Sequence, residues 1–346
     1  MNMTLETISE AIYRESAVLF VLDEVERRLH RVAAAREGTC GRLAAHLIQA
    51  GGKRLRPLLV ILSGECHSAC SKRGGGGGES SGSGARARES LINVAVTAEL
   101  IHTASLIHDD ILDRAATRRG RPTLNSLWGS HAAVLTGDFL FATAFGLLAR
   151  EHEGALALMA GAVRAMCEGE IQQAASLFDP ALTEKDYISR IEKKTASLLG
   201  ACCGAGALVA GAPAETVASL ISFGRNLGLG FQIIDDLLDF TRDEESLGKP
   251  AGSDLAQGIL TLPVIYLLQD GSRGQQVRKI LARRTCGPAE LAAIIQAVRE
   301  TPALDYAYQR AVHFTQKAKA CLACIPEQPA RSTLLAVADG VLARVN

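Results

Sequence analysis

The chain has 346 residues, of which 48% are hydrophobic and 21% are charged, so it has enough apolar side chains for a sizeable core. Its 37 Lys and Arg residues balance 37 Asp and Glu residues, and only 4% of the residues are aromatic. A neutral chain with so few stacking side chains is not expected to bind nucleic acid, because such binding needs a basic surface.

Hydrophobic residues recur with a helical period along most of the chain, and runs typical of strands are absent from the sequence. These patterns predict an all-α fold, organised as a single large helical domain over residues 1–346. The helices are expected at residues 5–33, 40–50, 56–70, 90–113, 131–151, 155–178, 184–211, 214–242, 260–270, 276–284, 288–299, 303–324 and 330–344.

Three features of the sequence bear on where the protein works. The first residues are polar with no apolar stretch, so we expect no signal peptide. The nine cysteines are scattered and odd in number, which indicates reduced thiols in a cytoplasmic protein. The uncharged segment 195–214 is long enough to span a membrane, but it contains four glycines and few large apolar residues. We therefore expect this segment to form a buried core helix.

Residues 72–89 form a low-complexity segment, KRGGGGGESSGSGARARE. Ordering five consecutive glycines costs backbone entropy, and no burial compensates for it. The segment also lacks the Gly-Lys-Ser/Thr ending of a phosphate-binding loop. We therefore expect a disordered Gly/Ser-rich loop at 72–89, between two helices of one domain.

Two acidic clusters of the same form dominate the polar residues of the chain. In each, the first and last carboxylates are four residues apart, so on a helix they project from one face. Hard carboxylate oxygens without paired His or Cys favour Mg²⁺, which usually shares its other positions with phosphate oxygens. The clusters are Asp109, Asp110 and Asp113 in LIHDDILD, and Asp235, Asp236 and Asp239 in GFQIIDDLLD.

Basic residues accompany these clusters at four places along the chain, which supports a phosphorylated ligand. One group follows a glycine pair at a predicted helix start, a typical anion site. Of the other three groups, one follows the first acidic cluster, one lies at the start of the uncharged segment, and one follows the second acidic cluster. They are the cations of GGKRLRP (51–57), RRGRP (118–122), KKT (193–195) and GKP (248–250).

Seven motifs in this order, within residues 51–263, resemble those of the trans-isoprenyl diphosphate synthases, the polyprenyl synthetase family. They are GGKRLRP, IHTASLIHDDILD, RRGRPTLN, GDFLF, EKKTASL, GFQIIDDLLD and GKPAGSDLAQGILTLP. The resemblance implies helices around a deep central cavity, usually in a homodimer. It also implies a Mg²⁺-dependent prenyltransferase that condenses isopentenyl diphosphate with an allylic diphosphate.

The resemblance also implies roles for individual residues. Asp109, Asp113, Asp235 and Asp239 would hold the metal ions, with Asp110 and Asp236 beside them. Isopentenyl diphosphate would be bound by Lys53, Arg56, His102 and Arg119, and the allylic diphosphate by Arg118, Lys194, Thr195, Gln232 and Lys249. One position departs from the family pattern, because Ile259 stands where many members have Lys.

The residues beneath Asp109 on the same helix bear on product length. Ala104 and Ser105 are small where the family's short-chain members carry bulky aromatic residues, so a growing chain should pass. One helical turn is about 5.4 Å, comparable with one isoprene unit. The cavity floor would then come from lower turns or from Phe139, Phe141 or Phe145. We therefore expect a long-chain product beyond C20, of the octaprenyl type used in quinone side chains.

Three alternatives remain at this stage. A terpene cyclase would lack GGKRLRP and the second Asp-rich motif, and both are present here. A partner subunit of a heteromeric synthase would typically have lost one acidic cluster, and both are intact. A short-chain farnesyl or geranylgeranyl diphosphate synthase differs only in its product. The allylic primer, the need for a partner subunit and any peripheral membrane contact during product release are left open.

Overall fold

The computed structural model describes residues 16–34, 38–74, 81–241 and 252–344. Apart from the two-residue strands β1 (Thr117–Arg118) and β2 (Arg121–Pro122), its regular elements are helical, so the all-α prediction is confirmed. The helices are α2 (Ser16–Ala34), α3 (Thr39–Ile48), α4 (Leu55–Gly74), α5 (Ser81–Leu112), α6 (Leu124–Leu148), α7 (Glu153–Ala175), α8 (Glu184–Ile191), α9 (Ser197–Val209), α10 (Ala214–Thr241), α12 (Ser253–Ala256), α13 (Leu262–Leu267), α14 (Gly271–Leu281), α15 (Pro288–Arg299), α16 (Ala303–Cys321) and α17 (Pro329–Leu342), with a π-helical turn at Glu192–Ala196 and a 3-10 turn at Leu322–Cys324.

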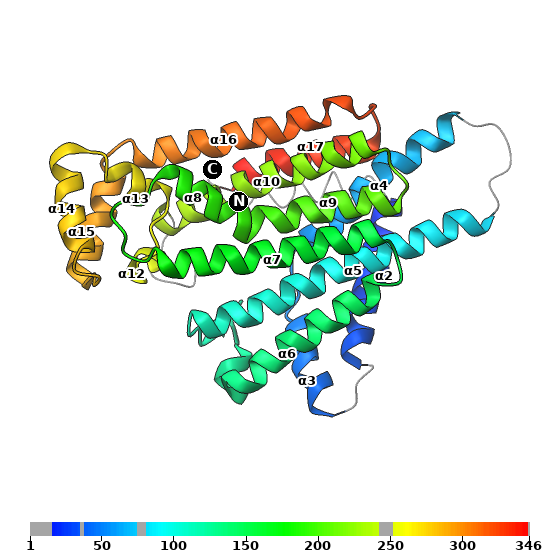
Figure 1. Ribbon diagram of the computed structural model, residues 1–346, viewed down its shortest axis with the longest axis horizontal. Helices are drawn as coiled ribbons and strands as arrows, with labels where there is room; N and C mark the ends of the chain where they lie inside the picture. Colours follow the sequence, from blue (N-terminus) through cyan, green and yellow to red (C-terminus); the bar gives the residue numbers. More distant parts are fainter. Residues whose placement is uncertain (1–15, 35–37, 75–80, 242–251, 345–346) are drawn as a thin grey trace.

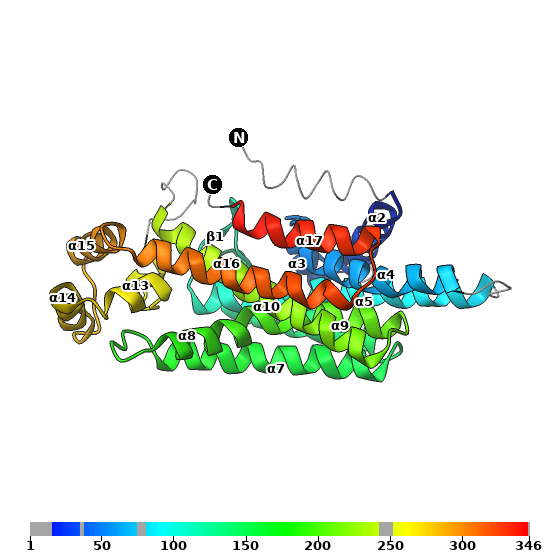
Figure 2. The same cartoon turned by 90° about the horizontal axis from the view of Figure 1, so that it is seen from above.

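The long helices lie side by side in an elongated bundle (Figures 1 and 2). Helix α10 packs against α9, α16 and α17, while α5 packs mainly against α6 and α4. The short helices α14 and α15 gather at one end of the bundle (Figure 1). Among the described residues, one continuous apolar core runs from α2 to α17.

Helix α9 is buried along almost its whole length, which confirms the expectation of a core helix. Every residue from Leu198 to Ala207 is buried. Its small residues let neighbouring backbones come close: a Cβ atom added at Gly206 would lie 2.1 Å from the carbonyl oxygen of Val60 on α4. The glycines of this segment therefore serve close helix packing inside the domain.

The structure describes helix over parts of the segment 72–89, for which the sequence predicts a loop. Helix α4 continues to Gly74 and α5 begins at Ser81, so only residues 75–80 of the segment lie outside the described residues. An established helix extends at little cost, because each added residue gains one backbone hydrogen bond. The Ala and Arg residues at 85–88 are also good helix formers. Of the helix predicted at 5–33, residues 5–15 lie outside the described part of the chain.

Three helices are long and apolar enough, by length and composition alone, to cross a membrane: α5 from Ala85, α6 and α10. The most apolar stretches of α5 and α10 are 72% and 56% buried inside the protein, whereas that of α6 is only 33% buried. Four large apolar side chains of α6 are 40–54% exposed, namely Leu127, Trp128, Val134 and Leu135. This exposed surface is called the α6 face below.

We predict that Gly206→Ala lowers the free energy of unfolding by about 1–3 kcal/mol, because the new methyl group would meet rigid backbone of α4. Gly161→Ala on α7 is the control, since no atom lies within 4 Å of its added Cβ. It should be neutral or stabilising by about 0.5–1 kcal/mol. Denaturant unfolding measures both variants, and equal stability of Gly206→Ala and the native chain would contradict the packing argument.

Candidate active site

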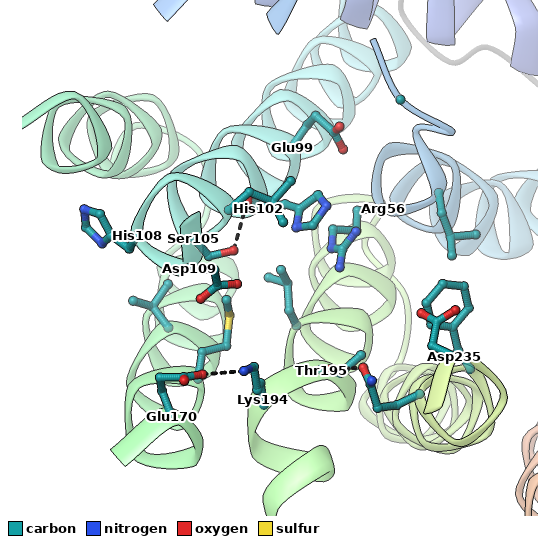
Figure 3. Close-up of a pocket in the computed structure, with 18 of the residues that line it drawn as sticks. Arg56, Glu99, His102, Ser105, His108, Asp109, Glu170, Lys194, Thr195 and Asp235 are labelled. Carbon is teal, nitrogen blue, oxygen red and sulfur yellow. Dashed lines mark hydrogen bonds and ion pairs between the residues drawn. The ribbon is translucent and has the colours of Figure 1, made fainter. Parts of the chain in front are cut away.

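The main cavity of the protein has a volume of about 900 Å³ and lies among α5, α6, α7, α9 and α10 (Figure 3). Asp109, Lys194 and Asp235 lie at its charged end, and Phe141 and Val163 contribute to its apolar wall. A smaller cavity of about 160 Å³ adjoins it, because Lys194, Thr195 and Gln232 line both. The molecule therefore has two neighbouring cavities, and the larger one has both charged and apolar lining residues.

The first acidic cluster lies at the end of α5. Asp109 lines the main cavity and Asp113, one residue beyond the helix, lines the smaller one. The Asp113 N–H donates to the Asp109 carbonyl at 2.8 Å, so the helical spacing is kept. Burial raises the pKa of Asp109 to about 6. A cation bound here would favour its ionised form.

Asp110 is held in a different way from the two outer carboxylates. Its side chain is 2% exposed and accepts a hydrogen bond from Arg118 Nε at 2.6 Å. Arg118 is carried by the β1–β2 hairpin, whose turn needs positive φ angles at Arg119 (52°) and Gly120 (73°). The guanidinium expected to bind allylic diphosphate is therefore paired with the middle carboxylate of the cluster.

The second acidic cluster projects from α10. Asp235 lines the main cavity and forms an ion pair with Arg344, just beyond α17. Asp239 is 9% exposed and accepts a hydrogen bond from Ser253 Oγ at 3.2 Å. Asp236 lines the smaller cavity and is 5% exposed. Its burial raises the pKa of the carboxyl to about 7.

A chain of hydrogen bonds connects Asp236 to the wall of the main cavity. Tyr187 Oη donates to Asp236 Oδ2 at 2.7 Å, and Gln232 Nε2 donates to Asp236 Oδ1 at 2.8 Å. Thr195 Oγ1 donates in turn to Gln232 Oε1 at 2.7 Å. The carboxyl thereby fixes the amide of Gln232, which in turn orients the Thr195 hydroxyl. Tyr187 lies outside the sequence motifs described above, so the sequence did not identify it as a residue of the site.

The basic loop before α4 forms another wall of the main cavity. Lys53, Arg56, His102 and Arg119 all line it, so the four residues expected to share one ligand do lie together. The loop is shaped by Gly51 (φ 68°) and Arg54 (φ 48°). Arg54 anchors it by binding Glu26 of α2 and the buried Glu99 of α5, each at 2.7 Å.

The charge state of this wall suits an anion. Arg56 Nε is buried and makes no hydrogen bond within the described residues. Burial, aided by the neighbouring arginines, lowers the pKa of His102 well below its usual range, so the imidazole is neutral at pH 7. Arg119 donates to the Gly51 carbonyl, which ties the hairpin to the basic loop. A buried donor without a partner is costly unless a ligand satisfies it.

The acidic residues fit a hard divalent cation that is only partly enclosed by protein. Among the described residues, no three His, Cys, Asp or Glu side chains are grouped closely enough to surround a metal ion. Asp109 and Asp235 instead line one cavity from different helices (Figure 3). Such a site matches an ion that completes its coordination with water or substrate oxygens.

The apolar wall contains one of the two α5 residues, Ala104 and Ser105, that the sequence analysis relates to product length. Ser105 lines the main cavity, but Ala104 is completely buried and is not among the lining residues, because one helical step of about 100° turns it into the core. Phe141 is a lining residue, whereas Phe139 and Phe145 pack against the core. Sequence reasoning missed the wall from α7, whose i, i+3, i+4 spacing could have revealed it: Val163, Met166, Cys167, Glu170 and Ile171.

The smaller cavity shows what surrounds the departure at Ile259. Its apolar side chain does line this cavity, together with Asp254. Arg190 lines it as well and donates to the Leu260 carbonyl at 2.6 Å, a contact that sequence reasoning did not anticipate. Lys249 lies outside the described residues.

Comparison with known proteins identifies relatives over nearly the full chain. The family model described as polyprenyl synthetase matches residues 37–298. The chain is 40% identical to heptaprenyl diphosphate synthase component 2 of Geobacillus stearothermophilus, covering 90% of this chain and 92% of that protein. It is 37% identical to octaprenyl diphosphate synthase of Haemophilus influenzae, with 86% of each chain covered.

A solved structure shows the same fold. The polyprenyl synthase of Caulobacter crescentus, crystallised with calcium and isoprenyl diphosphate, superposes with a TM-score of 0.85. The two chains are 32% identical, and the match covers 98% of each.

The two kinds of carboxylate should respond differently to neutralisation. We predict that Asp110→Asn lowers the free energy of unfolding by about 1–3 kcal/mol, because Arg118 would lose its charged partner. Asp113 is exposed, so Asp113→Asn should change stability by less than about 0.5 kcal/mol while removing most metal-dependent activity. Thermal unfolding and an activity assay on both variants measure these effects. A large stability loss for Asp113→Asn with unchanged stability for Asp110→Asn would contradict the different roles of the two carboxylates.

Proposed function

This chain belongs to the polyprenyl synthetase family, and on that basis we propose that it is a long-chain all-trans polyprenyl diphosphate synthase. The enzyme is a prenyltransferase that joins isopentenyl diphosphate head to tail to an allylic diphosphate. The observation that carries this proposal is one cavity with carboxylates on two helices, a basic loop and an apolar wall. These three parts match a metal-bound diphosphate, a second diphosphate and a growing hydrocarbon.

The residues of the site divide the work between the two substrates. Lys53, Arg56, neutral His102 and Arg119 would bind isopentenyl diphosphate through the buried donors described above. Asp109, Asp113, Asp235 and Asp239 would hold Mg²⁺, which would neutralise charge on the leaving diphosphate.

Other residues would favour formation of the allylic cation. The Lys194 ammonium, which lines the cavity, would stabilise charge that develops on the leaving diphosphate. Thr195 and Gln232 would present oriented oxygen atoms towards the cation, since their hydrogen-bond chain to Asp236 fixes them. The apolar residues of α5, α6 and α7 would exclude water, which would otherwise capture the cation.

The apolar wall and the relatives both support a long product. Ser105 leaves space on α5, and α7 extends the wall with Val163 and Met166. The relatives of known product reported above are a heptaprenyl and an octaprenyl diphosphate synthase. The name of the first, component 2, favours a second candidate role as one subunit of a heteromeric synthase. Against that role, both acidic clusters line cavities in this chain.

We also propose a homodimer formed through the α6 face. Leu127 and Trp128 lie before the kink in α6 at Gly129 (φ 81°), and Val134 and Leu135 lie after it; all four side chains are exposed. Exposed large apolar side chains grouped in this way mark an association surface. A second copy of the chain could cover the same residues by two-fold symmetry.

The product assay is the direct test of this function. Purified protein would be incubated with Mg²⁺, farnesyl diphosphate and labelled isopentenyl diphosphate, and dephosphorylated products would be separated by reversed-phase chromatography. We expect a product ladder that ends beyond C20. Products of C20 or shorter would indicate a short-chain synthase, and no incorporation would support the partner-subunit role.

We predict that Ser105→Phe shortens the product by at least one isoprene unit, because the ring would enter the cavity from α5. Ser105→Ala is the matched control and should leave the ladder unchanged. Ala104→Phe should instead lower stability by about 1–3 kcal/mol, because position 104 is fully buried. An unchanged ladder for Ser105→Phe would refute the role of Ser105 in the wall.

We predict that Leu135→Glu converts the native dimer into monomers, because a charge would be buried in the apolar contact. Phe20→Glu on α2 is the control, since Phe20 is 58% exposed on another helix. Sedimentation equilibrium measures the mass of each. A native chain that is already monomeric, or a Leu135→Glu variant that stays dimeric, would exclude the α6 face as the interface.

A further inference from the structure

Glu170 of α7 lies inside the main cavity and faces Lys194 (Figure 3). Its Oε2 atom is 2.6 Å from Lys194 Nζ, and the two side chains are only 24% and 32% exposed. This is a charged contact of good geometry in a partly desolvated place. None of the roles described above uses Glu170.

A second contact fixes the carboxylate of Glu170 on its other oxygen. Gln173 Nε2 donates to Glu170 Oε1 at 3.2 Å, and Gln173 is itself 8% exposed in the wall of the smaller cavity. Both oxygens of Glu170 are therefore engaged, one by a neutral amide and one by the ammonium. The carboxylate is held in one position and therefore restricts the conformation of the long, flexible side chain of Lys194.

The backbone brings the two residues together. A Cβ atom added at Gly169 would lie 2.9 Å from the backbone nitrogen of Lys194 and 3.0 Å from Cβ of Lys193. A side chain at position 169 would thus force α7 away from the π-helical turn at Glu192–Ala196. This close approach places Glu170 within reach of Lys194.

The Lys194 ammonium interacts electrostatically with two carboxylates, those of Asp109 and Glu170. Its charge acts on Asp109 as well as on Glu170, and it lowers the pKa of Asp109 against the larger effect of burial. The 2.6 Å contact keeps the ammonium on the α7 side of the cavity (Figure 3). The oxygens of Asp109 then remain available to a metal ion.

We propose that Glu170 is a positioning residue of the allylic diphosphate site, which holds the Lys194 ammonium in place for the diphosphate and away from Asp109. This inference rests on the proposed function of the cavity and deepens it. Without Glu170, the ammonium would turn to the other carboxylates of the site, Asp109 among them, and compete there with Mg²⁺. Binding of the metal-bound allylic diphosphate would weaken, whereas the isopentenyl site at Lys53 and Arg56 would not change.

The test compares Glu170→Gln with Glu168→Gln. Glutamine keeps the size of the side chain at position 170 and removes the charge. Glu168 lies two residues earlier on α7, is 53% exposed and is 3.7 Å from Lys193, so it is a matched control outside the cavity. The Michaelis constants of both substrates are measured, together with the Mg²⁺ concentration needed for inorganic diphosphate binding by titration calorimetry.

For Glu170→Gln we expect a rise of about tenfold in KM for farnesyl diphosphate and a change of less than about twofold for isopentenyl diphosphate, the size of effect typical of one coupled charged contact. Diphosphate binding should need more Mg²⁺. Glu170→Asp, which keeps the charge, should recover part of the loss. Equal effects on both substrates, or a Glu170→Gln variant that behaves like Glu168→Gln, would overturn the proposal.

A double-mutant cycle shows whether Glu170 acts through Lys194. In a Lys194→Gln background, Glu170→Gln should cause no further loss of diphosphate affinity. Additive losses would overturn the proposal. A native chain that binds diphosphate but forms no product would count against the proposed function alone, because the calorimetric comparison still tests the Glu170–Lys194 contact.

Discussion

The constraint on which the site depends is the cost of keeping carboxylates inside an apolar helical bundle. Burial raises the pKa of Asp109 to about 6 and that of Asp236 to about 7, so neither ionises as readily as in water. The protein offsets part of this cost with partners of its own: Arg118 for Asp110, and Tyr187 with Gln232 for Asp236. Asp109 and Asp235 line the main cavity and Asp113 lines the smaller one, where a cation could meet them.

This division gives the two acidic clusters a common design. In each, the middle carboxylate is buried and bonded to other residues of the site. Asp110 holds the hairpin of Arg118 and Arg119, and Asp236 orients Gln232 and Thr195. The repeated Asp-Asp-x-x-Asp pattern thus combines carboxylates that we propose to bind a cation with one carboxylate that supports the residues proposed to bind diphosphate. The loss of a middle Asp would act on geometry as well as on charge.

Close helix packing positions the π-helical turn that carries Lys194 and Thr195. Glycines on α7, α9 and α10 allow backbone to approach backbone: a Cβ at Gly228 would lie 2.5 Å from Cα of Ala196 in the π-helical turn. That turn lies between α7 and α10 and carries Lys194 and Thr195 into both cavities. An extra residue per turn, as in a π-helix, changes the direction of the side chains relative to a regular α-helix. The catalytic geometry therefore depends on positions that bear no functional group.

The sequence by itself determined the helical class, most helix boundaries and the residues that gather around the cavity, because these follow from local periodicity and from motifs of fixed spacing. It placed Asp109, Asp235, Lys53 and His102 correctly in one cavity. It did not predict that α4 and α5 extend into the segment 72–89, or that Ala104 points into the core, because the direction of Ala104 depends on how α5 packs against its neighbours. Only the tertiary structure revealed the contacts of Tyr187, Arg190 and Arg344 and the ion pair of Glu170 with Lys194, because these partners are 24 to 109 residues apart in the chain and meet through packing that no local pattern encodes.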